Sequence, residues 1–132
     1  MRGAAAARRD REGAPRPRTR RRLRRLEHDP NALALVRSVA EIRGIDIGEL
    51  MLSCRGAAEV ARSRQMAMYL VHVLLGRPQE EVGGIFRRDR TTVAHACHLV
   101  EDRRDDPRFE AEIAAVEARF SERLEQRAQH HG

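Results

Sequence analysis

The sequence predicts an all-α protein: a compact helical bundle that contains a helix-turn-helix, with a disordered N-terminal arm and an extra C-terminal helix. Apolar residues recur at three- and four-residue spacing in several successive segments, which is the period of a helix. Capping residues and glycines stand at the ends of these segments. No segment shows the apolar–polar alternation of a β-strand.

The composition limits the class of partner. The chain has 132 residues, enough for one domain with tails, and a formal net charge of +6, which is compatible with nucleic acid. All 26 basic residues are arginines. A GC-rich genome alone would explain this, although arginine also suits phosphate and guanine recognition. Only 3% of residues are aromatic, which argues against binding single strands by base stacking.

Residues 1–28 are predicted to form a disordered, arginine-rich arm. Ala, Gly, Pro and Arg dominate it, and Leu23 and Leu26 are its only large apolar side chains after Met1. Residues 1–30 carry eleven arginines against four acids. The arm therefore either adds sequence-blind DNA affinity that salt removes or is a solvated tail without a role.

The folded part, residues 29–104, is predicted to begin with two helices. Asp29 can cap the first helix, and Gly44 ends it. Its apolar stripe consists of Leu33, Leu35, Val36, Val39 and Ile42. Asp46 and Glu49 have the spacing of a capping box and start a short helix.

A longer helix is predicted from about residue 57 to residue 75, ending at Gly76. Its inward positions are Val60, Ala67, Leu70 and Leu74. A second, more polar stripe consists of Arg62, Gln65, Tyr69 and His72.

Residues 78–104 are predicted to form a short helix, a basic turn and a second helix. The inward face of the second helix consists of Val93, Ala96, Cys97 and Val100. Its opposite face carries Arg90, Thr91, Ala94, His95 and His98. In a helix-turn-helix the second helix enters the major groove by its N-terminal residues, so this pattern indicates a binder of double-stranded DNA.

The last segment, residues 105–132, is predicted to be an acidic amphipathic helix with a frayed end. Asp106 and Pro107 are suited to its start. Its apolar stripe consists of Phe109, Ile113, Val116, Phe120 and Leu124. The stripe needs a partner surface, which is either the protein's own core or a homodimer or partner-protein contact.

Several other kinds of site are not expected. Cys54 and Cys97 stand far apart, which suggests reduced thiols, and there is no membrane span or secretory signal, so cytoplasm follows by default. Cys97 falls on the apolar face, away from His95 and His98, so no metal site is predicted. The adjacent acids of the predicted short helix would point in different directions, so they do not form a catalytic pair of carboxylates. No nucleophile is implied either. We therefore expect a protein without enzymatic activity, metal or cofactor.

Four stretches closely resemble the C-terminal DNA-binding domain of the bacterial replication initiator DnaA. They are Val39-Ala40-Glu41, Arg64-Gln65-Met66-Ala67-Met68-Tyr69-Leu70, Glu81-Val82-Gly83 with Phe86, and Arg88-Asp89-Arg90-Thr91-Thr92-Val93-Ala94-His95-Ala96. The last is close to the family's signature. The resemblance covers about half of the chain and implies a Trp-repressor-like helical domain that reads a short box in duplex DNA.

The resemblance also implies roles for individual residues. Asp89, Arg90 and Thr91 fall where the family contacts bases, and Arg88 precedes them in the signature. Thr92 and His95 fall where the family contacts phosphates or supports its base contacts. Residues matching its DNA-backbone anchors are Arg64 and Gln65, with His72 in place of a basic residue and Arg55 as the remnant of a basic minor-groove loop.

Three departures from the family matter. The family has histidine where this chain has Arg90, and arginine can hold guanine with two bonds, so the box is expected to differ. The turn at Arg87-Arg88 is one residue shorter than the family's, which could reorient the second helix. The minor-groove loop keeps only Arg55, and the N-terminal arginines are expected to supply the missing charge. Asp89 itself could read cytosine or cap the helix.

The leading hypothesis is a small stand-alone protein that binds duplex DNA with sequence preference and regulates transcription or replication initiation. The chain has no lysine, so it lacks the phosphate loop of the initiator's ATPase module and should not bind nucleotide by that route. The alternatives are a charge-driven binder without sequence preference and an adaptor that acts through its last helix.

Overall fold

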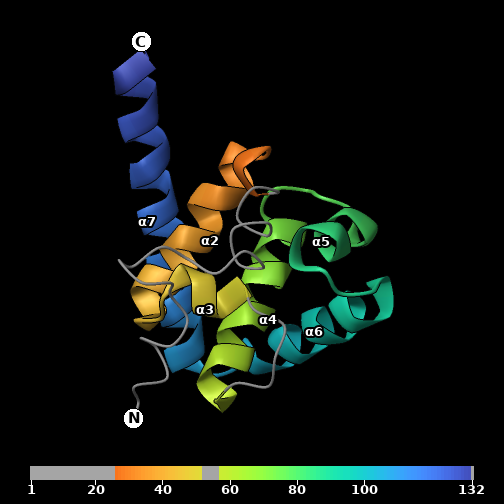
Figure 1. The fold of residues 1–132 in the computed structure, drawn as a ribbon. Helices are drawn as coiled ribbons and strands as arrows, with labels where there is room; N and C mark the ends of the chain where they lie inside the picture. The colour runs from red at the N-terminus through yellow and green to blue at the C-terminus, as the bar shows by residue number, and fades with distance from the viewer. Residues whose placement is uncertain (1–25, 52–56, 132) are drawn as a thin grey trace, which may run out of the picture.

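The computed structural model describes residues 26–51 and 57–131 and shows six helices within them (Figure 1). In chain order they are α2 (Pro30–Arg43), α3 (Ile47–Met51), α4 (Ala58–Val73), α5 (Gln79–Phe86), α6 (Arg90–Arg103) and α7 (Pro107–His131). The described ranges contain no strand. The all-α prediction is confirmed. Helix α4 lies between α2 and α6, and α7 packs along α2.

Local signals set the ends of the first two helices. The Asp29 carboxylate accepts a hydrogen bond from the backbone N–H of Ala32 at 3.2 Å, which satisfies an otherwise unpaired donor of α2. Gly44 ends α2 in the left-handed conformation, with φ of 68°. Helix α3 follows Asp46, whose carboxylate accepts from the backbone N–H of Glu49 at 3.1 Å. The predicted starts of both helices are confirmed.

The folded part begins earlier than the predicted boundary at residue 29. Residues 26 and 27 are helical, and Leu26 is fully buried in the core. The Leu26 carbonyl also accepts a hydrogen bond from the backbone N–H of Asp29 at 2.9 Å. Assigning residues 26–28 to a disordered arm is therefore wrong, because Leu26 packs in the core and its carbonyl oxygen is bonded by the next helix start. Residues 1–25 of the predicted arm lie outside the described residues.

The core draws on all six helices, and α4 supplies much of it. The largest fully buried side chains include Tyr69, Phe86, Leu26, Leu35, Leu50, Met51, Met66, Leu70 and Ile113. Burying one side chain of this size stabilises the fold by about 1.5–3 kcal/mol. Helix α4 carries three of them, so its position largely fixes the other helices.

Two predicted positions on the α4 segment are wrong. Tyr69, placed on the polar stripe, is only 1% exposed, because its hydroxyl finds polar partners inside the bundle. Leu74, predicted to face inward, is 42% exposed. The helix ends at Val73, and the chain then turns toward Gly76, whose φ is 72°. Ile42, in the last turn of α2, is likewise exposed.

Helix α7 belongs to the folded unit. Its stripe residues Phe109, Ile113, Val116 and Phe120 are buried in the same core as α2 and α4. The stripe was expected to pack either on the protein's own core or on another protein chain, and the structure shows it on the protein's own core. In Figure 1 the C-terminal part of α7 extends past the other helices. None of the helices in the described ranges has the length and apolarity needed to cross a membrane.

Ion pairs tie α7 and α4 to α2. The Glu41 carboxylate accepts hydrogen bonds from Arg119 at 2.7 Å and from Arg123 at 2.6 Å. These bonds lower the pKa of Glu41 to about 2. Arg43 donates to Glu59 and Glu112, both at 2.6 Å, and so joins the end of α2 to both neighbouring helices.

Candidate nucleic-acid interface

Helices α5 and α6 meet through a close approach of two backbone segments. A Cβ atom on Gly83 of α5 would stand 2.5 Å from the carbonyl oxygen of Arg88, closer than side chains tolerate. The Gly83 carbonyl in turn accepts a hydrogen bond from the backbone N–H of Arg88 at 2.9 Å. Glycine at this position lets the turn fold back onto α5, and that contact sets where α6 begins.

The turn itself holds a strained residue. Arg87 has φ of 58° and ψ of 48°, and it is the one non-glycine residue with positive φ in the described ranges. This left-handed conformation costs an ordinary residue about 1–2 kcal/mol. The Arg87 side chain is exposed. The turn is thus held in place by the backbone contact at Gly83, at some cost in strain.

Asp89 caps α6. Its carboxylate accepts a hydrogen bond from the backbone N–H of Thr92 at 2.7 Å. This bond, together with hydrogen bonds from the Thr92 hydroxyl and the Thr91 N–H, lowers the pKa of Asp89 below its usual value. Of the two roles considered for this carboxylate, the structure shows the cap.

The outer face of α6 carries a row of exposed side chains, which we call the outer row. It consists of Arg90, Thr91, Thr92, His95 and His98. The inward positions Val93, Ala96, Cys97 and Val100 are buried, as the helical period predicted. The outer row is not covered by α7. It therefore offers a polar surface along one side of the second helix, as the helix-turn-helix pattern requires.

Arg90, at the first position of α6, is exposed and makes no hydrogen bond or ion pair with any described residue. Arg88 is different. It is half-buried, and its guanidinium donates to the carbonyl oxygen of Phe86 at 3.0 Å, so it braces the turn. Arg87 was not among the predicted site residues, nor was His98. Their exposure adds both to the candidate surface, and for Arg87 the sequence signal is its place in the basic turn.

Positive charge on the helix-turn-helix is local. Residues 77–104 carry six arginines against five acids, so the unit is almost neutral overall. Three of the arginines, at positions 87, 88 and 90, lie together at the turn, whereas four of the acids lie at the start of α5 and the end of α6. The N-terminal dipole of α6 adds to this positive end. The beginning of α6 is therefore the place where phosphates would be attracted.

The opposite end of α6 is anchored. The Tyr69 hydroxyl of α4 donates to Glu101 at 2.5 Å and accepts a hydrogen bond from Arg104 at 3.0 Å. Arg104 also pairs with Glu110 of α7. The guanidinium of Arg103 lies 4.3 Å from the centre of the Phe109 ring. Fixing this end to α4 and α7 holds the outer row in one orientation.

The predicted backbone anchors on α4 are less accessible than the outer row. Arg64 is 8% exposed, and its Nε donates to the carbonyl oxygen of Leu50 at 2.9 Å, which ties α4 to the end of α3. Gln65 is half-buried. The burial of Arg64 favours a supporting role, and its direct contact with DNA stays a prediction. Arg55 lies outside the described residues.

His72 is also half-buried and bonded within the protein. Its ring Nδ1 lies 2.7 Å from the carbonyl oxygen of Arg77, so this nitrogen is the protonated donor. The bond closes the connection between α4 and α5. Arg77 in turn pairs with Asp29 at 2.8 Å and so links the same connection to α2.

The histidines of α6 do not converge with Cys97. His95 and His98 are exposed, whereas Cys97 is buried, and burial raises the pKa of its thiol. A buried protonated thiol facing the core is not placed to share a metal ion with side chains on the outer face. Within the described ranges no cluster of three or more metal-binding side chains occurs.

A sequence model of one known family matches this chain. The family is described as the bacterial dnaA protein helix-turn-helix, and the match covers residues 34–100, just over half of the chain. The matched stretch runs from within α2 to near the end of α6 and includes the whole turn between α5 and α6. Helix α7 lies outside it.

Proposed function

The chain belongs to the family of bacterial DnaA helix-turn-helix domains, and on this premise we propose that it recognises a short box in double-stranded DNA with sequence preference. The family binds double-stranded DNA, so DNA binding follows from membership. The proposal concerns the readout: the N-terminal turn of α6 enters the major groove and contacts base edges there.

The free guanidinium of Arg90 is the observation that carries this proposal. A side chain at the start of the second helix of a helix-turn-helix lies where base edges are reached. Arg90 is exposed there and has no partner among the described residues, so no internal bond must break before it binds. Arginine can donate two hydrogen bonds to O6 and N7 of guanine. We therefore assign guanine recognition to Arg90.

The neighbours of Arg90 have different parts in this readout. The Asp89 carboxylate is occupied by the N-terminus of α6, so it positions the helix rather than reading cytosine. Thr91 and His95 lie on the outer row, one and five residues after Arg90, and can contact a base or phosphate. The exposed Arg87 suits a phosphate contact, which adds affinity without sequence information.

Selection of random duplexes on the purified protein tests the assignment. Arg90→Ala should relax the preference at one base pair, with a loss of about 1–3 kcal/mol of discrimination. Arg87→Ala is the matched control, because it removes another exposed arginine three residues away. It should weaken all sequences alike and reduce the salt dependence of binding. Equal losses at every base pair for Arg90→Ala would contradict the assignment.

A second candidate function is binding by charge alone. Residues 1–25 carry eleven arginines against two acids, a density that attracts any phosphate backbone. Deleting residues 2–25 separates the two functions. Under sequence-preferring recognition the preferred box survives, with weaker affinity and a shallower salt dependence. Under charge-driven binding the affinity collapses and no box remains.

The biological output that we propose is regulatory rather than enzymatic. The chain contains no lysine and hence no Gly-x-x-x-x-Gly-Lys loop for nucleotide phosphates. A protein that reads a DnaA-like box without nucleotide control would regulate transcription near that box or compete there with the initiator. Competition between the two proteins on the selected duplex is the direct measurement. Unhindered simultaneous binding would exclude competition.

A further inference from the structure

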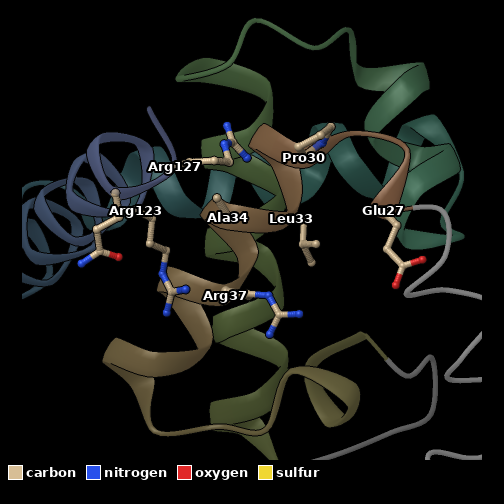
Figure 2. Close-up of a pocket in the computed structure, with 8 residues that line it drawn as sticks. Glu27, Pro30, Leu33, Ala34, Arg37, Arg123 and Arg127 are labelled. Atoms are coloured by element: carbon tan, nitrogen blue, oxygen red, sulfur yellow. The ribbon is translucent and has the colours of Figure 1, made fainter. Parts of the chain in front are cut away.

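A groove lies between the first half of α2 and the C-terminal half of α7, on helices other than the one that carries the outer row (Figure 2). Its volume is about 430 Å³. The residues that line it are Glu27, Pro30, Leu33, Ala34, Arg37, Arg123, Gln126 and Arg127. We call it the α2–α7 groove.

The floor of the α2–α7 groove is apolar. Pro30, Leu33 and Ala34 come from consecutive turns of α2 and form it. Leu33 packs against the core on one side but is only partly buried, so the rest of its side chain faces the groove. A ligand with an apolar group of its own would remove this surface from water.

Arginines surround this floor, and their charge is incompletely compensated. Figure 2 shows Arg37 on α2 and Arg123 and Arg127 on α7 around Leu33 and Ala34. Arg37 is exposed and forms no ion pair with a described residue, and Arg127 donates to the neutral amide oxygen of Asn31.

Arg123 is already held by a carboxylate of the protein. Its Nη2 bonds Glu41, but its Nε is buried and has no hydrogen-bond partner. A buried N–H without an acceptor is unfavourable. Glu27 is the one acid among the described residues of the lining, against three arginines, so an apolar floor edged by Arg37 and Arg127 fits a ligand that is both apolar and anionic.

The protein's own segments do not match this chemistry. Residues 1–25 carry eleven arginines against two acids, so the groove would repel them. The C-terminal half of α7 in a second copy, residues 117–131, carries three arginines against three acids and offers no net negative charge. Duplex DNA is anionic, but its backbone has no apolar side chain for Leu33.

We propose that the α2–α7 groove docks a short acidic amphipathic segment of a partner protein. Its apolar side chains rest on Leu33 and Ala34, as an amphipathic helix rests in a hydrophobic groove. Its carboxylates bond the guanidinium groups of Arg37 and Arg127. Because α6 takes no part in the groove, the chain can hold this partner and DNA at the same time. This makes it an adaptor as well as a DNA-binding protein.

The test uses the full chain and a fluorescein-labelled peptide of about twelve residues, with leucines at helical spacing and glutamates between them. A scrambled peptide of the same composition, with its leucines spread over all faces, is the first control. It carries the same charge and therefore reports attraction to the N-terminal arginines. The second control is Arg108→Glu, which makes one such charge reversal, against two in the double variant, at an exposed position near the start of α7.

We expect the wild type and Arg108→Glu to bind the amphipathic peptide equally. The double variant Arg37→Glu/Arg127→Glu should bind it at least about tenfold more weakly, and so should the wild type with the scrambled peptide. Circular dichroism checks that each variant is folded. If the scrambled peptide binds as well, or the double variant binds unchanged, the attraction is to charge alone and the proposal is wrong.

Sedimentation of the same variants without peptide tests whether a second copy of the chain fills the groove. A wild type that self-associates, with association lost in Arg37→Glu/Arg127→Glu, would show that a second copy fills the groove and would overturn the proposal. Association that is equal in both proteins, or absent in both, leaves the groove open to the peptide and supports it.

Discussion

Where α7 packs against α2, three arginines bond carboxylates (Arg43, Arg119 and Arg123), whereas at the turn between α5 and α6 two exposed arginines have none. Arg43 and Arg119 each pair with acids of a neighbouring helix. Arg87 and Arg90 form no ion pair within the described part of the chain. The paired arginines hold helices together, and the unpaired ones are available to phosphates and bases. Net charge alone would not have distinguished them.

The two regions also differ in packing. The apolar stripe of α7 is closed over by α2 and the core, while the outer row of α6 is covered by nothing in the described ranges. Substitutions in α7 should therefore change the free energy of unfolding, and substitutions in the outer row should change DNA binding. Separating these two effects experimentally is the way to test the comparison.

The largest effect is expected from Ile113→Ala in α7. Ile113 is fully buried, and truncating such a side chain leaves a cavity that costs about 2–5 kcal/mol. Leu124→Ala, in the half-buried last part of the same stripe, should cost clearly less. Urea denaturation measures both. Equal small losses would mean that α7 is not part of the cooperative fold, whatever its contacts with α2.

Gly83→Ala should have the next largest effect, this time at the turn. The added Cβ would lie 2.5 Å from the carbonyl oxygen of Arg88, so the turn must shift. Overpacking of this kind costs about 1–3 kcal/mol. It should also displace α6 and weaken recognition of the preferred duplex. Gly84→Ala, one residue along the same helix and without positive φ, is the control and should preserve both stability and binding. Losses of the same size in both variants would contradict the role given to Gly83.

Features governed by local chemistry were predictable from the sequence. Asp29 has a side chain that satisfies a helix N-terminus within three residues, so the start of α2 could be predicted without knowing the fold. The inward and outward faces of α6 follow from the helical period of Val93, Ala96 and Val100. The exposed position of Arg90 on the opposite face follows from the same pattern.

Features that depend on distant partners were not predictable. Tyr69 can be buried because Glu101, 32 residues away, accepts a hydrogen bond from its hydroxyl group. Arg64 can be buried because its guanidinium donates a hydrogen bond to the carbonyl oxygen of Leu50, near the end of α3. Leu26 joins the core although its neighbours in the sequence are charged. In each case the sequence contains the residue but not the contact that decides its place.

A smaller and stabilising effect is expected from Arg87→Gly. Glycine adopts the left-handed conformation without the steric cost that Arg87 bears, so folding should gain about 1 kcal/mol, less the entropy that glycine adds to the unfolded chain. DNA affinity should fall slightly at the same time, because one exposed charge is lost. Thermal unfolding and a binding titration measure the two changes. A destabilised variant would show that the Arg87 side chain makes a contact that outweighs the strain.

The smallest effect is expected at the paired arginines, and it is present near neutral pH and fades in acid. Hydrogen bonds from Arg119 and Arg123 lower the pKa of Glu41 from 4.5 to about 2 in the folded state. A lowered carboxylate pKa stabilises the fold above pH 4.5, and this stabilisation is lost as the pH falls toward 2. Glu41→Gln should therefore flatten the decline in unfolding free energy between about pH 6 and about pH 3.

Glu125→Gln is the matched control for this change, because Glu125 is an exposed acid of α7 that forms no ion pair with a described residue. Its acid profile should follow that of the wild type. If Glu41→Gln also follows the wild type, the two arginines are solvated in solution rather than paired. The contrast between the α2–α7 side and the turn would then rest on apolar packing alone, since screening by solvent leaves exposed ion pairs with little net stabilisation.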